Sequence, residues 1–137
     1  MLQELFNTRI RVAIDKFEMI TLSDPKEGED LSITSSDSIS WEAYPTHLRV
    51  KFLREISFVP ECCFQIKASY IVDHFLTSEN SLSALSPEDI AEEINSNPRF
   101  FIQESQGFIG RIVLLIAQAT SAFGGPPLIL PTSLQQN

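Results

Sequence analysis

The chain has 137 residues, of which 43% are hydrophobic and 20% charged, and a formal net charge of −8 at pH 7. This length suits a single domain over residues 1–137, and the composition is that of a folded globular protein, not of a disordered chain. No cluster of Lys and Arg offsets the acidity, so phosphate backbones would be repelled and nucleic acid is disfavoured as a partner.

The sequence predicts a cytoplasmic protein without a membrane span. Residues 1–9 lack the charged and then apolar run of a secretory signal. The strongest apolar run, residues 108–123, is shorter than the roughly 20 residues that a span requires, and it contains Arg111 and Gln118. Cys62 and Cys63 adjoin in an expected strand, where their side chains would point to opposite faces, which predicts reduced, structural cysteines.

The first part of the chain alternates like a half-buried strand. Over residues 6–22, Ile10, Val12 and Ile14 share one parity, and the phase changes near Lys16, as a bulge would produce. Residues 23–30 are rich in turn-forming and charged residues and predict a loop.

Three further stretches alternate in the same way, at residues 31–43, 48–58 and 64–72. The first of them could form one strand or two short ones. Because the connections between successive stretches are short, the pattern predicts a four-stranded antiparallel meander.

Helices follow the strands. Ser86 with Pro87 and Asp89 has the pattern of a helix N-terminus, and this short helix should end near Asn95. A longer helix is predicted over residues 108–122, before a Gly-then-Pro stop. The order predicts an α+β domain with a short and a long helix packed on one side of the sheet.

The longer helix is apolar on almost every side, so burying one face on its own sheet would leave apolar surface uncovered. A self-association interface and a ligand groove are the two physical options for that surface. We assign Ile109, Ile112 and Ile116 to an oligomer interface.

The sequence shows no pattern for catalysis, a metal or a cofactor. His47 and His74 have no partners at ligand spacing, and Cys62 and Cys63 lack the Cys-x-x-Cys spacing of redox and zinc sites. The sequence contains no Gly-rich phosphate loop and no nucleophile elbow. We therefore expect a protein that is not an enzyme.

Several aromatic residues lie near the ends of the expected strands: Phe17, Trp41, Phe58 and Phe75. Such rings belong to a core in most proteins. They could also line a groove for extended apolar peptides, because they offer a large contact area at little cost in side-chain entropy.

The exit of the long helix resembles that of the SecB export-chaperone family. Gly124, Pro126, Leu128, Leu130 and Pro131 match the family's Gly-then-Pro-x-Leu-x-Leu pattern. The order of four strands, a short helix, a long helix and this exit is similar to the family across nearly the whole chain.

The resemblance implies a holdase that needs no ATP, a homotetramer built as a dimer of dimers, and binding of non-native polypeptides or preproteins in apolar grooves. We assign client contact to seven residues: Phe17, Met19, Trp41, Phe58, Phe75, Leu128 and Leu130. The chain lacks the family's glycine pair late in the fourth strand and its extended C-terminal helix. These departures weigh against docking to the SecA motor and suggest a divergent SecB-like protein, such as one that serves an antitoxin.

Two other functions compete with that of a general holdase. The first is an adaptor that assembles with itself or with one dedicated partner, and it would bind one client only. The second is a small hydrolase or ligand-binding enzyme, which is disfavoured because no nucleophile and base come together in the pattern.

Overall fold

The computed structural model describes residues 1–122 and 126–135, and Gly124 of the exit pattern lies outside them. Within the described residues, four strands, three α-helices and three short 3-10 helices follow one another. In order, they are η1 (Gln3–Leu5), β1 (Phe6–Thr21), β2 (Ser32–Ala43), β3 (His47–Val59), β4 (Phe64–Leu76), η2 (Ser81–Ala84), α1 (Pro87–Ser96), α2 (Pro98–Phe101), η3 (Glu104–Gln106) and α3 (Phe108–Ser121). Every predicted strand and helix is present, and residues 31–43 form one strand.

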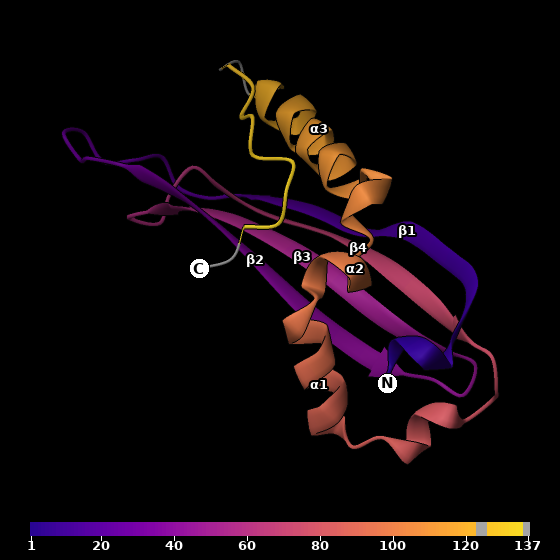
Figure 1. The fold of residues 1–137 in the computed structure, drawn as a ribbon. Coiled ribbons are helices and arrows are strands. Elements are labelled where there is room, and N and C mark those ends of the chain that lie inside the picture. Colours follow the sequence, from indigo (N-terminus) through magenta and orange to yellow (C-terminus); the bar gives the residue numbers. More distant parts are fainter. Residues whose placement is uncertain (123–125, 136–137) are drawn as a thin grey trace.

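The four strands form one antiparallel sheet in the order β1-β4-β3-β2 (Figure 1). Only β2, β3 and β4 form a meander, so the prediction of a four-stranded meander is wrong for β1, which pairs with β4 at the other side of the sheet. The physical reason is the connection over residues 22–31. It is longer than a hairpin turn and lets the chain cross to the far edge. Both β1 and β2 are therefore edge strands.

The predicted bulge near Lys16 is confirmed. Ile14 pairs with Tyr70 and Lys16 with Ser69, so that Asp15 is the extra residue and the register shifts between them. After the shift Phe17 pairs with Ala68 and returns to the face of the sheet that carries Ile14.

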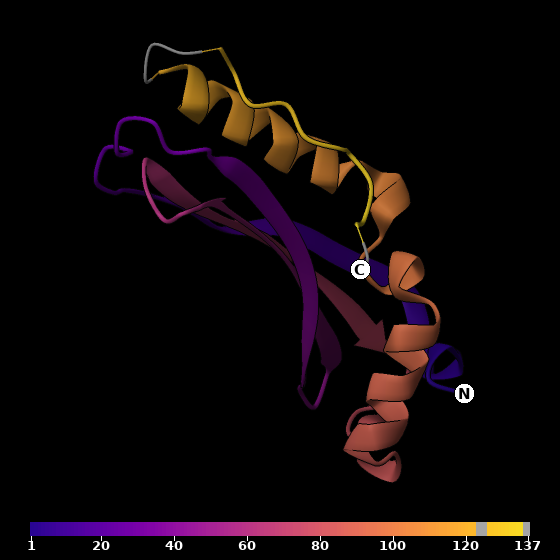
Figure 2. The same ribbon diagram turned by 90° about the vertical axis from the view of Figure 1, so that its left-hand side faces the viewer.

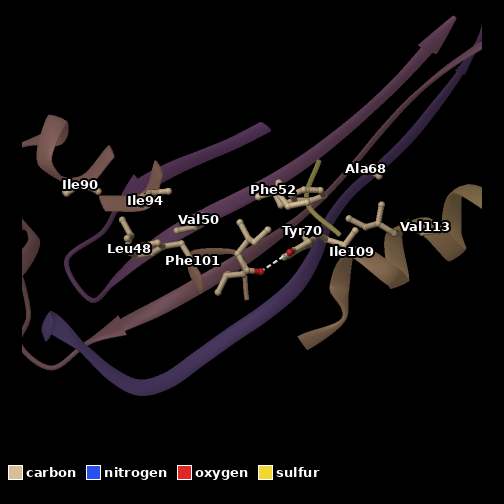
Figure 3. Close-up of a cluster of buried hydrophobic side chains, with 14 of the residues drawn as sticks. Leu48, Val50, Phe52, Ala68, Tyr70, Ile90, Ile94, Phe101, Ile109 and Val113 are labelled. Carbon is tan, nitrogen blue, oxygen red and sulfur yellow. Dashed lines mark hydrogen bonds between the residues drawn. The ribbon is translucent and has the colours of Figure 1, made fainter. Parts of the chain in front are cut away.

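All helices lie on one face of the sheet, as predicted (Figure 2). On β3, the side chains of Leu48, Val50 and Phe52 have no exposed area, and Tyr70 of β4 is equally buried. Ser86 caps the N-terminus of helix α1, and its side chain accepts a hydrogen bond from the amide of Asp89, as the capping pattern predicts. Figure 3 shows Leu48, Val50, Phe52 and Tyr70 in the hydrophobic core between the sheet and the helices.

Helix α3 is more amphipathic than its composition suggests. Its exposed positions are Arg111, Leu114, Gln118 and Ser121, spaced by three or four residues along one side. The expectation that α3 leaves a broad apolar surface uncovered is therefore wrong. Among these four exposed positions, Leu114 alone carries a large apolar side chain, and it is 59% exposed. Leu115 and Ala117 of the same helix are partly buried.

The two cysteines lie in the connection between β3 and β4, not in a strand as predicted. Cys63 has a φ of 64°, and this backbone turn brings the two Sγ atoms to 3.4 Å from each other. Both are free thiols. Burial, assisted by the neighbouring Cys63, raises the pKa of Cys62 to about 11, which keeps this thiol protonated and unreactive at neutral pH.

Candidate polypeptide-binding groove

An apolar hollow of about 330 Å³ opens between the far end of the sheet and the exit of α3. We call it the Ile33 hollow. Its lining consists of Ile33, Phe58, Phe64, Thr120, Pro126, Pro127 and Leu128. Ile33 pairs with Phe58 across β2 and β3, which places both side chains on the helix-covered face. Ile33 is 46% exposed, so this hollow offers apolar area to an incoming chain.

The exit of α3 is fixed to the helix at the rim of this hollow. The amide of Leu128 donates to Thr120 Oγ1 at 2.8 Å, and Thr120 Oγ1 itself donates to the carbonyl oxygen of Ile116. Thr120 is 5% exposed, so the wall formed by Leu128 is held by a buried hydroxyl. The hollow is therefore a preformed feature of the fold.

A second apolar hollow, of about 310 Å³, lies at the other end of β2. We call it the Trp41 hollow. Its lining consists of Trp41, Ala43, Tyr44, Pro45, Asn80, Leu82, Ser83, Leu85, Pro87 and Ile90. Trp41 pairs with the buried Val50, so its ring lies on the helix-covered face, as Ile33 does. Both hollows thus lie along one face of edge strand β2.

Residues 131–135, which we call the strap, cross the sheet between the two hollows (Figure 1). The strap contacts a buried ion pair. Arg54 donates to both carboxylate oxygens of Asp37, at 2.7 and 2.8 Å, and neither side chain has exposed area. Arg54 also donates to the carbonyl oxygens of Pro131 and Ser133, at 2.6 and 3.1 Å. The ion pair therefore holds the strap as well as joining β2 to β3.

Sequence reasoning missed this pair, although a signal existed. Arg54 has the same parity as Phe52 and Ile56, and Asp37 has the parity of Ile39. Opposite charges at the inward positions of two successive strands predict a buried ion pair, because an unpaired charge there would be costly.

The predicted client-binding residues are spread over several parts of the sheet and do not form one site. Phe58 and Leu128 line the Ile33 hollow, Trp41 lines the other hollow, and Leu130 is partly buried against the core. Phe17, 36% exposed, and Met19 lie on β1.

Phe75 lies apart from the other six residues. It pairs with His47, on the face of the sheet away from the helices, and the guanidinium of Arg9 covers its ring at 4.4 Å. The structure brings together Phe58 and Leu128 and separates Phe75 from both.

The residues assigned to an oligomer interface are core residues of the single chain. Ile109, Ile112 and Ile116 have no exposed area and pack in the main hydrophobic cluster. The helix presents them to its own sheet, so they have no surface left for a second copy. Exposed apolar side chains are found instead on edge strand β1, where Ile14 and Ile20 are 41% and 44% exposed.

The face away from the helices is polar. Arg49 binds both carboxylate oxygens of Asp73, at 2.8 and 3.2 Å, and Lys51 lies 3.3 Å from Asp15. Asp73 is 2% exposed, and its hydrogen bonds raise the pKa of Arg49. Ion pairs thus lie on this face of the sheet, and the two apolar hollows lie on the other face.

The described residues contain neither a cluster of metal ligands nor a membrane-spanning helix. In residues 1–122 and 126–135, no group of three or more His, Cys, Asp or Glu side chains could hold a metal ion. Within the same part of the chain, no helix is long and apolar enough to cross a membrane.

Comparison with solved structures identifies the fold. A SecB-like chaperone from Mycobacterium tuberculosis, solved in complex with a ChAD peptide from the HigA1 antitoxin, superposes with a TM-score of 0.57. The match covers 95% of this chain and 92% of that one, at 14% sequence identity. The chain has a SecB-like fold. This confirms the α+β architecture that the exit pattern and the order of elements predicted.

Sequence comparison gives a different set of relatives. No family model matches the chain. Curated proteins from Xylella fastidiosa strains 9a5c and M23, each named GTP cyclohydrolase FolE2, are 28% identical over 109 residues, which is 72% of this chain. The chain spans 37% of the length of these curated relatives.

Proposed function

We propose that this protein is an ATP-independent holdase that binds extended, non-native polypeptides in the Ile33 hollow. The observation that carries the proposal is this open hollow of about 330 Å³, bounded by Ile33, Phe58 and Leu128. An unfolded chain exposes apolar side chains that gain free energy by entering such a hollow, at roughly 25 cal/mol per Å² of buried apolar area. The SecB-like fold supports the same function.

The proposal is tested by light scattering of an aggregating client, such as thermally denatured citrate synthase, without ATP. We expect the protein to suppress aggregation at a small molar excess. The variant Ile33→Asp should lose most of this protection, because a charge would have to be desolvated wherever a client fills the hollow. Ile33 is half exposed, so the fold should tolerate the change.

The matched control is Ile129→Asp, which adds the same charge next to the wall residue Leu128. Ile129 is 74% exposed and does not line the hollow, so this variant should protect as the wild type does. No suppression by the wild-type protein at excess would refute the holdase. Equal loss in both variants would remove the Ile33 hollow from the binding site.

The alternative is an adaptor with one dedicated partner. The M. tuberculosis protein is bound to a peptide from an antitoxin, which favours a SecB-like chaperone that serves such a partner. Suppression of aggregation with several unrelated clients supports the general holdase. Suppression with none of these clients, but capture of one antitoxin peptide, would support the adaptor.

We also propose that the protein works in the cytosol as a homotetramer, with preproteins among its clients. The sequence departures described above disfavour the SecA motor as a further partner. The exposed apolar residues of β1, including Ile14, Phe17 and Ile20, favour assembly through that edge. Mass measurement in solution tests the tetramer. Co-elution with purified SecA tests the motor contact.

A second candidate function comes from the sequence relatives, which are named GTP cyclohydrolase. In this second candidate function, the chain is part of a GTP cyclohydrolase. Incubation with GTP and chromatographic measurement of GTP consumption tests it. Consumption of GTP would support this candidate and would revise the expectation that the protein is not an enzyme.

A further inference from the structure

The Ile33 hollow and the Trp41 hollow lie in line along β2, with Asp37 midway between them. Ile33, Asp37 and Trp41 have the same parity and face the helix-covered side. Four residues of strand span roughly 13 Å, so the two hollows are about 26 Å apart. An extended chain of about eight residues would reach from one to the other. The strap occupies the middle of that path, over Asp37 and Arg54.

Arg54 and Asp37 hold the strap through its backbone groups and not through its side chains. Arg54 donates to the carbonyl oxygens of Pro131 and Ser133, and Asp37 Oδ2 accepts the amide of Gln135 at 2.8 Å. The carbonyls belong to residues two apart and the amide follows two residues later. Any extended polypeptide offers this series of groups, whatever its side chains.

The strap itself is lightly attached by its side chains. Leu134 is 4% exposed, whereas Pro131, Thr132 and Gln135 are exposed and Ser133 is partly buried. A further bond joins the amide of Leu134 to Glu104 at 3.2 Å. The strap has one buried apolar anchor and a few hydrogen bonds to side chains, and a segment with so few buried apolar contacts can open locally without unfolding the rest of the domain.

We propose that the strap occupies, in cis, the place of a client's main chain and competes with clients for the Asp37–Arg54 ion pair. When the strap leaves, the two hollows join into one groove along β2. An extended client then places apolar side chains in both hollows and its backbone on the ion pair. This inference rests on the proposed holdase function, and it adds a regulation to that function, since the closed strap weakens client binding.

The test measures binding of a fluorescently labelled, extended apolar peptide of twelve residues to the full chain. Leu134→Ala removes the buried anchor of the strap and should bind the peptide at least about threefold more tightly than the wild type, because the open form is more populated. The matched control is Ile129→Ala, outside the strap and 74% exposed, which should bind as the wild type does. Equal or weaker binding by Leu134→Ala would overturn the strap proposal.

Hydrogen exchange of the wild-type protein gives a second test that needs no variant. The amides of Leu134 and Gln135 donate to Glu104 and Asp37 in the closed strap. Addition of the peptide should speed exchange of these two amides and leave that of Leu128, on the wall of the Ile33 hollow, unchanged or slower. Unchanged or slower exchange at Leu134 and Gln135, with the peptide bound, would contradict the proposal. If the wild type binds no peptide and suppresses no aggregation, the holdase function itself is refuted and the strap proposal with it.

Discussion

His74 on β4 donates a hydrogen bond from Nε2 to the carbonyl oxygen of Phe101 on α2, at 2.8 Å. The carbonyl can only accept, so this nitrogen carries the proton. The rings of Phe6 and Phe100 lie on the imidazole, at centroid distances of 4.8 and 5.6 Å. The bond fixes the short helix α2 on the sheet.

This arrangement predicts a pH dependence of stability. Burial lowers the pKa of His74 below 6.5, and it outweighs the opposing effects of the bond to Phe101 and of the Asp73 carboxylate. The unfolded chain therefore binds more protons than the folded one just below pH 6.5, so stability is lost as the pH falls through that value. Urea unfolding at pH 7.5 and 5.5 should give a lower free energy at pH 5.5. In His74→Gln, whose amide can still donate to Phe101, the difference between the two pH values should shrink; an unchanged difference would contradict the assignment.

The buried ion pair predicts a strong coupling between two substitutions. Arg54→Met leaves the Asp37 carboxylate buried and unpaired, and should cost about 3–5 kcal/mol of unfolding free energy. Asp37→Leu should be similarly costly, because it leaves the guanidinium unpaired. The double variant should cost clearly less than the sum of the two, as urea titration of all four proteins can show. Additive effects would mean that the pair is not coupled.

Loss of the buried Tyr70 hydroxyl should lower the unfolding free energy by less than loss of one partner of the ion pair. Its hydroxyl donates to the carbonyl oxygen of Ile102 at 2.8 Å, and neither residue has exposed area (Figure 3). Tyr70→Phe leaves that carbonyl unsatisfied and should lower the unfolding free energy by about 1–3 kcal/mol. The control is Tyr44→Phe, since the Tyr44 hydroxyl bonds to Glu42 at the surface. An equal loss in both variants would argue against a special role of the buried bond.

The fluorescence of Trp41 can report peptide binding in the Trp41 hollow, because the sequence contains one tryptophan. A bound apolar peptide without tryptophan should cover the indole, which lines the hollow, and shift its emission to shorter wavelength. A peptide of equal length with Asp in place of the apolar residues should cause no shift. A shift of the same size with both peptides would mean that the indole does not report apolar contact.

The sequence predicted the elements well because their signals are local. Alternation on β3, the capping pattern at Ser86 and the phase change near Lys16 all depend on near neighbours and are all present in the structure. The position of β1 beside β4 depends on where a long connection crosses, which no local pattern specifies. The meander was therefore wrong for that strand alone.

The site was predicted less completely for the same physical reason. Phe58 was singled out as an aromatic residue near a strand end and Leu128 as part of the exit pattern, and both line one hollow. Ile109, Ile112 and Ile116 were assigned to an interface because composition cannot tell which side of a helix meets its own sheet. The role of Asp37 and Arg54 depends on a segment far away in the sequence, residues 131–135, which folds back onto them.

The central claim is that a client chain enters the Ile33 hollow on the helix-covered face, and site-specific photo-cross-linking tests it most directly. The photo-reactive residue p-benzoylphenylalanine would replace Phe58, which lines the hollow, or Phe75, which lies on the opposite face. We predict cross-links between an unfolded client and the chain modified at position 58, and few from position 75. Cross-links of equal yield from both positions, or from position 75 alone, would contradict the account.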